Sequence, residues 1–433
     1  GVMKTATLRS ALLLLFLTFT SSAIGQGFVL GLSHESRIFS SFRSLNVYLP
    51  LEYDFNDPTV RYPVIYFLHG SGTNQDGYTA ITVMIDSLRA ENKISPMLMV
   101  FPDGSAGQFG GSYYSNSALY GSMEDYIAFE VVQFIDSEFH TAPEREQRFI
   151  MGHSMGGYGA MRLAVDHPEI FRGGVSHSGI PDLTQFKTWI PTLLTENGGA
   201  PPYNFTPSRI FTIDAFAMSG AWSPNLSKPP YFVDFPLDSQ GNLIDSVFAR
   251  WQEHNPARLV SNLSPEDNLA LFFDCGLQDR FLIVPWNDAF ADSLDRLGLP
   301  YEYQTFQGGH SEKLLARLRI SLAWVDSVFK APPPVSAVQG RETRVPAAFA
   351  LYQNFPNPFN PATSIRFALP RQSAITLKVY DVTGREVMTL AEGKFSAGVH
   401  EVPLATGRLA SGLYFYRLSA EGFSQTRKLT VMK

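Results

Sequence analysis

The sequence predicts an α/β domain with a mostly parallel sheet, followed by a small all-β, immunoglobulin-like sandwich. From residue 64 to residue 329, short apolar runs alternate with helix-like segments, as in a parallel sheet that helices cover on both faces. After residue 346, short runs rich in Val, Ile, Tyr, Phe and Leu alternate with turn residues. A proline-rich stretch, 331–346, separates the two patterns and predicts a linker between domains at 26–330 and 347–433.

The individual elements follow from run length and flanking residues. In the first domain, strands are expected at 64–68, 97–101, 149–151, 269–274 and 301–306. Helices are expected at 80–92, 122–139, 155–167, 286–297 and 311–329, with Pro168 ending the third. In the second domain, strands are expected at 364–369, 374–380, 385–390, 413–418 and 426–431.

Composition indicates a globular protein of more than one domain. The chain has 433 residues, of which 45% are hydrophobic and 17% charged. Its single cysteine, Cys275, excludes an intrachain disulfide and a thiolate zinc site. We find no metal-binding motif, so we expect neither a metal nor a cofactor. Residues 26–346 contain 22 basic and 35 acidic residues, a net charge of −13, which argues against a nucleic-acid partner.

The N-terminal segment has the pattern of a secretory signal peptide over residues 1–25. Lys4 and Arg9 precede an apolar run at 11–19, and small residues follow at 23–25. The run is shorter than the 18 or so apolar residues that a membrane helix requires. We therefore expect export without a membrane span.

A serine lies between a predicted strand and a predicted helix in the stretch "RFIMGHSMGGYGAMRLAV". The pentad 152–156 fits G-x-S-x-G, a sharp turn that lifts the serine hydroxyl above the end of a parallel sheet. The alternative is a glycine-rich turn that merely needs small residues for close packing. Because the strand and the helix are both in place, we predict that Ser154 is a nucleophile.

A nucleophilic serine on this kind of sheet needs an acid and then a histidine further along the chain. Asp279 follows the predicted strand at 269–274, and His310 follows the strand at 301–306. Ligands and catalytic groups on parallel sheets gather at these carboxyl ends. We therefore predict Asp279 as the acid and His310 as the base.

Three other residues compete for these roles. Asp274 lies within its strand, where a carboxylate points toward a neighbouring layer. His177 precedes nearly every plausible acid, and His254 lies in a segment rich in Trp, Asn and Pro that reads as structural. The chain order favours the first assignment.

The catalysis also needs backbone N–H donors for a developing oxyanion. Met155 directly follows the nucleophile, and its N–H is the first expected donor. The loop in "YFLHGSGTNQDG" follows the first buried strand and supplies the second, although it could also be a plain connection. Its glycines allow the backbone to approach a substrate closely.

Residues 180–260 form an insertion between the elbow and the acid. The insertion contains three of the five tryptophans, Trp189, Trp222 and Trp251, together with many prolines that favour irregular structure. One interpretation is a lid whose aromatic rings stack on the substrate. The other is a small hydrophobic cluster that holds the insertion together.

The motifs "FLHGSG", "FPDGSAG", "GGSYYSNS", "GHSMGGYGAMRLA", "DCGLQDRF" and "GGHS" together resemble the esterase D-like branch of the α/β-hydrolases. That branch includes S-formylglutathione hydrolases, feruloyl and acetylxylan esterases, enterochelin esterases and mycolyltransferases. The resemblance covers residues from about 40 to 330. It implies the catalytic residues and oxyanion donors Ser154, Asp279, His310, Ser71 and Met155, and the substrate-binding residues Tyr114, Asn116 and His153. The insertion at 180–260 departs from the pattern, so the resemblance leaves specificity open.

The last 85 or so residues resemble the C-terminal sorting domain of the type IX secretion system. The resemblance rests on "LYQNFPNPFNPATSIRFALP", "VYDVTGREVMTL", "SAGVHEV", "LASGLYFYRL" and "RKLTVMK". It implies export across a Gram-negative outer membrane to the cell surface or the medium, with the secretion machinery as a partner. The residues alone indicate only a small sandwich, which could also bind carbohydrate.

Together these observations predict a secreted serine esterase that acts through an acyl-enzyme. The expected substrates are acetyl or feruloyl esters of polysaccharides, or other simple acyl esters. One alternative is an acyltransferase that uses the same three residues. An alternative of another class is a surface carbohydrate-binding or adhesion protein on a hydrolase scaffold.

Overall fold

The computed structural model describes residues 26–199, 203–206, 208–263, 267–331, 349–351, 354, 357, 359, 362–405, 407 and 409–431. The chain divides into two compact units, Gly1–Pro334 and Val335–Lys433. The predicted signal peptide and residues 332–346 of the predicted linker lie outside the described residues.

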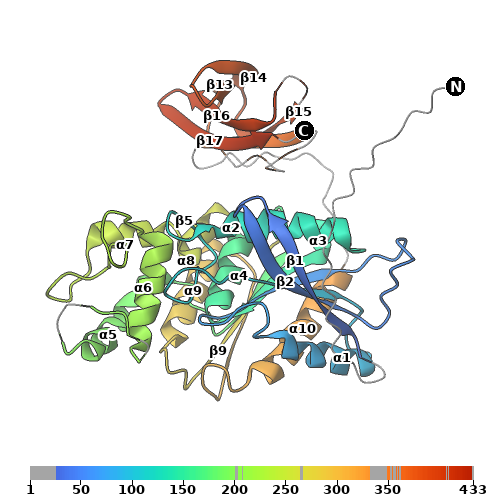
Figure 1. Ribbon diagram of the computed structural model, residues 1–433, viewed down its shortest axis with the longest axis vertical. Coiled ribbons are helices and arrows are strands. Elements are labelled where there is room, and N and C mark those ends of the chain that lie inside the picture. Colours follow the sequence, from blue (N-terminus) through green and yellow to red (C-terminus); the bar gives the residue numbers. More distant parts are fainter. Residues whose placement is uncertain are drawn as a thin grey trace. The chain divides into compact units, whose positions relative to one another are not determined.

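The first unit is built on an eight-stranded sheet with the order β1-β2-β4-β3-β7-β8-β9-β10. Figure 1 labels β1, β2 and β9 of this sheet. The strands are Phe28–Ser36, Ser41–Leu49, Leu98–Pro102, Val64–Leu68, Arg148–His153, Gly173–His177, Ala270–Gly276 and Glu302–Phe306, in that spatial order. The pairings β1–β2 and β2–β4 are antiparallel, and the remaining five pairings are parallel. The predicted mostly parallel sheet is confirmed, with an antiparallel pair added at one edge.

Alternate residues of each strand face opposite sides of the sheet, so the unit has two cores. In β3, Val64, Tyr66 and Leu68 enter one core, whereas Ile65 and Phe67 enter the other. The helices α1 (Thr82–Ala90) and α10 (Leu314–Lys330) cover the second core. The first core is covered by α2 (Met123–Asp125), α3 (Val132–Glu138), α4 (Met155–Asp166) and α9 (Val284–Leu297). A π-helical turn at Tyr126–Val131 joins α2 to α3, which confirms the predicted helix at 122–139.

The insertion is more helical than its prolines predict. It contains α5 (Ile190–Glu196), α6 (Ile210–Trp222), α7 (Asp245–Gln252) and α8 (Pro256–Leu259). The expectation of irregular structure is wrong for α6, since this 13-residue helix has no proline and is buried along nearly its whole length. Pro191 and Pro256 lie in the first turns of α5 and α8, where a proline is tolerated, and Pro224 and Pro236 lie outside the helices.

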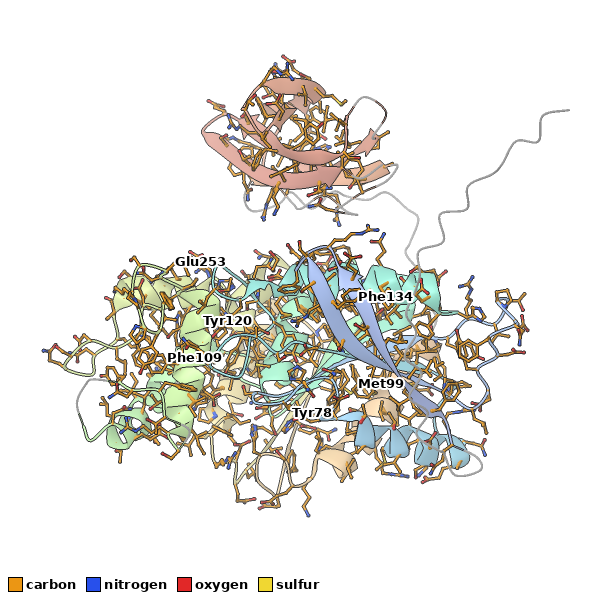
Figure 2. The ribbon with its side chains drawn as sticks, viewed as in Figure 1. Tyr78, Met99, Phe109, Tyr120, Phe134 and Glu253 are labelled. Atoms are coloured by element: carbon orange, nitrogen blue, oxygen red, sulfur yellow. The ribbon has the colours of Figure 1, made fainter. Side chains whose placement is uncertain are left out.

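The three tryptophans of the insertion lie inside it. Trp189, Trp222 and Trp251 are at most 3% exposed, and their indole N–H groups donate to the Phe281 carbonyl, Ser115 Oγ and Ser223 Oγ respectively. Figure 2 labels Phe109 and Tyr120, which lie in the loop that precedes α2 and hold this loop against α6. The Phe109 ring lies 5.4 Å from that of Phe216. The tryptophans therefore form a hydrophobic cluster, not a surface on which a substrate stacks.

The second unit is a small β-sandwich. One sheet contains β11 (Ala350–Leu351), β12 (Ala362–Leu369) and β15 (Gly398–Ala405). The other has the order β14-β13-β16-β17, with β13 at Ser373–Asp381, β14 at Glu386–Phe395, β16 at Gly412–Ala420 and β17 at Phe423–Val431. All pairings between these strands are antiparallel. Alternate residues such as Ile365, Phe367, Leu377 and Val379 fill one shared core, as the sequence pattern predicts.

Candidate active site

Ser154 lies at the sharp turn between β7 and α4. Its φ of 59° and ψ of −121° are rare for a residue with a side chain, and such a conformation persists only where the surroundings fix it. The Ser154 N–H donates to the His177 carbonyl at 2.9 Å, and the Ser154 carbonyl accepts from the Tyr158 N–H at 3.1 Å. The turn is therefore tied both to the neighbouring strand and to the first turn of α4.

The glycines of the pentad allow the backbone to close around this turn. A Cβ atom on Gly152 would lie 2.2 Å from the Gly156 carbonyl oxygen, and one on Gly156 would lie 2.0 Å from the Leu68 carbonyl oxygen. Any side chain at either position would collide with backbone. The two glycines allow the helix to pack closely on the strand, and this close packing raises the strained serine above the strand end.

The structure brings together the three residues predicted to be catalytic. His310 Nε2 lies 2.8 Å from Ser154 Oγ, and His310 Nδ1 lies 2.7 Å from Asp279 Oδ2. Since a carboxylate accepts, Nδ1–H donates to Asp279, and Nε2 is left to accept the serine proton. The second carboxylate oxygen accepts from the Phe281 N–H at 2.8 Å. Asp279 is 4% exposed, so the whole hydrogen-bonded chain is shielded on the acid side.

An aromatic wall links the histidine to the insertion. The Phe281 ring packs edge-on against the His310 ring at 4.6 Å between centroids. Its other aromatic neighbours are Trp189 and Phe211, at 6.1 Å and 5.7 Å between centroids. The insertion therefore supports the loop that carries the acid and covers one side of the base.

The competing acid and histidine pair with each other, away from the surface. His177 Nδ1 lies 3.0 Å from Asp274 Oδ2, and His177 Nε2 lies 2.9 Å from Ser321 Oγ. The Asp274 carboxylate also accepts from Arg317 Nε at 2.8 Å. Ser321, His177 and Asp274 therefore form a second serine–histidine–aspartate chain of contacts. All three residues are at most 1% exposed. Because no substrate reaches them, they form a buried polar cluster beneath the elbow.

His153 is buried and contacts the backbone of the predicted base, and its role in substrate binding stays a prediction. Its ring is 3% exposed, with Nε2 at 3.0 Å from the His310 carbonyl and Nδ1 at 2.7 Å from the Tyr78 hydroxyl. A carbonyl only accepts, so Nε2 carries the proton and Nδ1 accepts from Tyr78. Ser178 Oγ donates to the same His310 carbonyl at 3.0 Å. Two donors therefore hold the backbone of the predicted base.

Burial gives His153 a measurable effect on acid stability. Burial, followed by the nearby His310 charge, lowers the pKa of His153 to about 3. In the unfolded chain the histidine titrates near its ordinary value of about 6.5. Between these values the unfolded state binds one more proton, so stability falls as the pH falls. The free-energy difference between the wild type and His153→Gln should shrink by about 1.4 kcal/mol per pH unit below 6.5. Urea unfolding at several pH values measures it; a difference that is independent of pH contradicts the assignment.

The two other residues predicted to bind substrate lie in different surroundings. Tyr114 is fully buried, and its hydroxyl donates to the His69 carbonyl at 2.8 Å; its role in substrate binding stays a prediction. Its ring fills the space beside Gly159, where a Cβ would lie 2.5 Å from it. Asn116 is exposed, and its amide exchanges hydrogen bonds with Asp125. Its role in substrate binding stays a prediction.

The predicted oxyanion residues lie beside the nucleophile. A Cβ on Gly70 would lie 3.4 Å from Ser154 Cβ, which places the loop before Ser71 against the serine. A Cβ on Gly111 would lie 2.4 Å from Met155 Sδ and 3.3 Å from Ser71 Oγ, so both residues border the same glycine. Met155 is the first residue of α4, where backbone N–H groups have no partner within the helix. The geometry is compatible with an oxyanion site, and the donor roles stay predictions.

Sequence reasoning missed Tyr113, which lies close to this site. Its hydroxyl interacts with Ser71 and with the buried carboxyl of Asp214 on α6. Burial, followed by the Glu196 charge, raises the pKa of Asp214 to about 7. The motif "SYYSNS" contains two adjacent tyrosines, and both have a positive φ, 47° and 49°. No pattern in the sequence indicates which of the two hydroxyls approaches Ser71, because the conformation of this loop decides it.

A parallel sheet with an elbow serine hydrogen-bonded to a histidine and a buried acid defines a serine hydrolase of the α/β-hydrolase class. Residues 36–317 match the family described as "Putative esterase", and the chain belongs to this esterase family. The chain is 28% identical over 270 residues to Esterase MT1326 of Mycobacterium tuberculosis, a match that covers 61% of this chain and 52% of that protein. It therefore spans about half the length of this curated relative. Over 154 residues it is 29% identical to an endo-1,4-beta-xylanase/feruloyl esterase of Xylanibacter ruminicola, covering 34% of this chain and 21% of that protein.

Two solved structures share the fold. A ferulic acid esterase is 19% identical and superposes with a TM-score of 0.51, covering 70% of this chain and 99% of that chain. FphF, a fluorophosphonate-binding serine hydrolase of Staphylococcus aureus, is 22% identical and has a TM-score of 0.50 over the same shares. These likenesses confirm the predicted α/β-hydrolase fold.

The second unit matches the secretion system C-terminal sorting domain over residues 353–432. This match confirms the resemblance seen in the sequence and indicates secretion to the outer surface or the extracellular space. Within the part of the chain that the structure describes, no helix is both long enough and apolar enough to span a membrane.

Proposed function

We propose that this protein is a secreted serine esterase that hydrolyses carboxylic esters through an acyl-enzyme on Ser154. One observation carries the proposal: the continuous hydrogen-bonded chain from Asp279 through His310 to Ser154 Oγ, with contacts of 2.7 Å and 2.8 Å. The elbow conformation and the esterase family support it. The buried residues His177, Asp274 and Ser321 cannot catalyse this reaction, because a substrate has no access to them.

In the first half of the reaction, Ser154 Oγ attacks the ester carbonyl carbon while its proton moves to His310 Nε2. The carbonyl oxygen becomes negative and faces the backbone N–H groups of Ser71 and Met155. The bond to the alcohol oxygen then breaks, and His310 gives its proton to the departing alkoxide. Throughout, Asp279 keeps the imidazole in the tautomer that can accept at Nε2.

In the second half, water attacks the acyl-enzyme. His310 takes the water proton as the oxygen bonds to the acyl carbon, and the bond to Ser154 Oγ breaks. The proton returns to the serine, and the free acid leaves. Each half therefore uses His310 first as a base and then as an acid.

We infer that the substrates are acetyl or feruloyl esters of polysaccharides. Two similar proteins support this inference, a ferulic acid esterase and the xylanase/feruloyl esterase of Xylanibacter ruminicola. Secretion also supports it, because a polysaccharide too large to enter the cell must be processed outside. We further infer that the C-terminal unit engages the secretion machinery that recognises such sorting domains.

Product analysis tests this function against its alternatives. The protein is incubated with p-nitrophenyl acetate, acetylated xylan and feruloylated arabinoxylan, each with and without an added sugar alcohol as acceptor. A hydrolase releases free acetate or ferulate in proportion to the alcohol set free. Acyl transfer to the acceptor as the main product would make it an acyltransferase, and binding of polysaccharide without any turnover would indicate an adhesin.

A further inference from the structure

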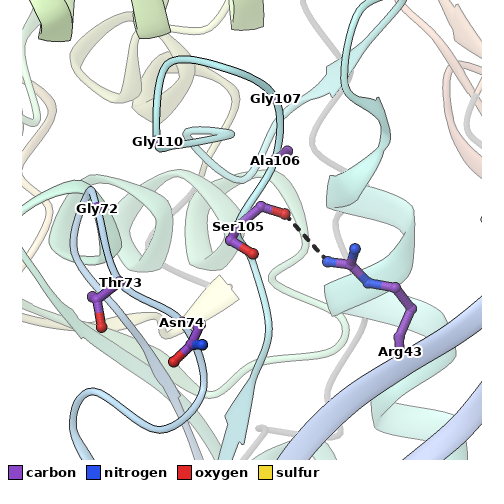
Figure 3. Close-up of a pocket in the computed structure, with 8 residues that line it drawn as sticks. All are labelled: Arg43, Gly72, Thr73, Asn74, Ser105, Ala106, Gly107 and Gly110. Atoms are coloured by element: carbon purple, nitrogen blue, oxygen red, sulfur yellow. Dashed lines mark hydrogen bonds between the residues drawn. The ribbon is translucent and has the colours of Figure 1, made fainter.

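A recess lies beside the loop that follows Ser71, one of the two predicted oxyanion donors. The recess has a volume of about 560 Å³ (Figure 3). Gly72, which directly follows Ser71, forms part of its wall. The Gly72 N–H donates to the Gly110 carbonyl at 2.7 Å, which joins the two loops that line the recess. The recess therefore begins one residue away from the proposed oxyanion site.

The same two loops also touch the nucleophile's neighbours. Gly111 follows Gly110 and lies against Met155 Sδ and Ser71 Oγ, as its close approach to both atoms indicates. Gly70, at the start of the other loop, lies against the Ser154 side chain. A substrate whose ester carbonyl sits at Ser154 could therefore extend directly into the recess.

The lining of the recess is polar and nearly free of apolar side chains. Thr73 and Ser105 contribute hydroxyl groups, Asn74 contributes an amide, and Ala106 contributes one methyl group. Gly72 and two further glycines expose backbone. No aromatic ring is among these lining residues, so a feruloyl group would find no surface on which to stack. Such a lining suits a ligand with many hydroxyl groups.

The one charged lining residue, Arg43, does not make the recess an anion site. Its guanidinium lies 3.2 Å from the Asp103 carboxylate and donates to the Asp103 and Ser105 carbonyls at 2.8 Å and 3.3 Å. All three contacts are made by Nη2, so the Asp103 carboxylate offsets the charge, and Nε is buried without a hydrogen-bond partner among the described residues. A carboxylate or phosphate ligand would have to compete with Asp103, whereas a neutral hydroxyl would not.

We propose that this recess binds a sugar unit in the alcohol part of the ester. The proposal rests on the proposed esterase function, and it assigns specificity to the alcohol part of the substrate. Asn74 Oδ1 accepts from the Asp76 N–H at 3.0 Å, which fixes the side chain and directs its NH₂ group to another acceptor. Sugar hydroxyls supply such acceptors.

Two variants test the recess, with p-nitrophenyl acetate as a substrate whose alcohol part has no sugar. Ala106→Trp fills the recess, and Asn74→Ala removes one donor without adding volume. For an acetylated xylo-oligosaccharide, Ala106→Trp should lower kcat/KM by about tenfold or more, and Asn74→Ala by about two- to tenfold, mainly through KM. Both variants should keep wild-type turnover of p-nitrophenyl acetate. Ala90→Trp, on the exposed end of α1, is the control and should change neither substrate.

The outcomes separate this proposal from the proposed function. If the wild type hydrolyses neither substrate, the esterase function itself fails. If it hydrolyses both and the variants leave their ratio unchanged, the function stands and the sugar subsite is wrong. Equal losses on both substrates would also overturn the subsite, because the substitutions would then act on the catalytic machinery.

Discussion

Replacement of Ser154 by alanine should lower kcat for p-nitrophenyl acetate by about 10⁴- to 10⁶-fold, since the reaction loses its nucleophile. Alanine keeps the Cβ atom, so the strained φ of 59° costs the folded protein no more than serine does. The variant should therefore unfold at nearly the wild-type temperature. Initial rates and thermal melts measured on the same preparations check both expectations.

The buried cluster offers a matched control for this substitution. Ser321→Ala also removes a serine hydroxyl that contacts a histidine, at 2.9 Å, but one that no substrate reaches. It should leave kcat within a few-fold of wild type and lower stability by about 1 to 3 kcal/mol, because His177 loses a buried partner. If Ser321→Ala abolishes activity while Ser154→Ala does not, the assignment of the nucleophile is wrong.

Two aspartates should respond to the same substitution in opposite ways. Asp279→Asn places an amide NH₂ group where His310 Nδ1–H must donate, which favours the wrong tautomer and should lower kcat by about 10⁴-fold. Its stability should change little, provided that the asparagine carbonyl still accepts from the Phe281 N–H. The measurement is kcat, with the unfolding free energy from urea denaturation.

Asp274→Asn should instead reduce stability. This carboxylate is fully buried and lies 2.8 Å from Arg317 Nε, so its removal leaves a buried cation without its partner. Breaking such a pair costs about 3 to 5 kcal/mol. The protein that remains folded should keep most of its turnover. The reverse pattern, with Asp274→Asn inactive and Asp279→Asn merely unstable, would exchange the two roles.

The fold was predictable where the local sequence of a segment indicates its secondary structure. The buried strands of the parallel region are continuous apolar runs, and the elbow has its pentad, so β3 and β7 were located from local sequence. The strands β1 and β2 were missed, because Gly, Ser and His interrupt the apolar pattern of β1 and Arg, Ser and Asn interrupt that of β2. Pairing stabilises both strands, since β1 pairs with β2 and β2 pairs with β4. In the same way, β15 has no continuous apolar run and forms by pairing with β12.

The candidate site was predictable where chain order and strand ends determine it. Asp279 and His310 follow parallel strands whose carboxyl ends meet at one edge, so their positions in the chain place them near Ser154. The burial of His153 and Tyr114 was not predictable, because a shift of one residue along a strand or a loop turns a side chain to the opposite side. The roles of Tyr78 and Tyr113 depend on long-range contacts, for which the sequence contains no local signal.

Covalent labelling tests the central claim most directly. The wild type and His310→Ala are incubated with a fluorophosphonate, which traps a serine that an adjacent base activates, and the labelled peptides are identified by mass spectrometry. The account predicts one equivalent of adduct on Ser154 in the wild type and a strongly reduced labelling rate in His310→Ala. Adduct on another residue, or loss of activity without any adduct on Ser154, would contradict it.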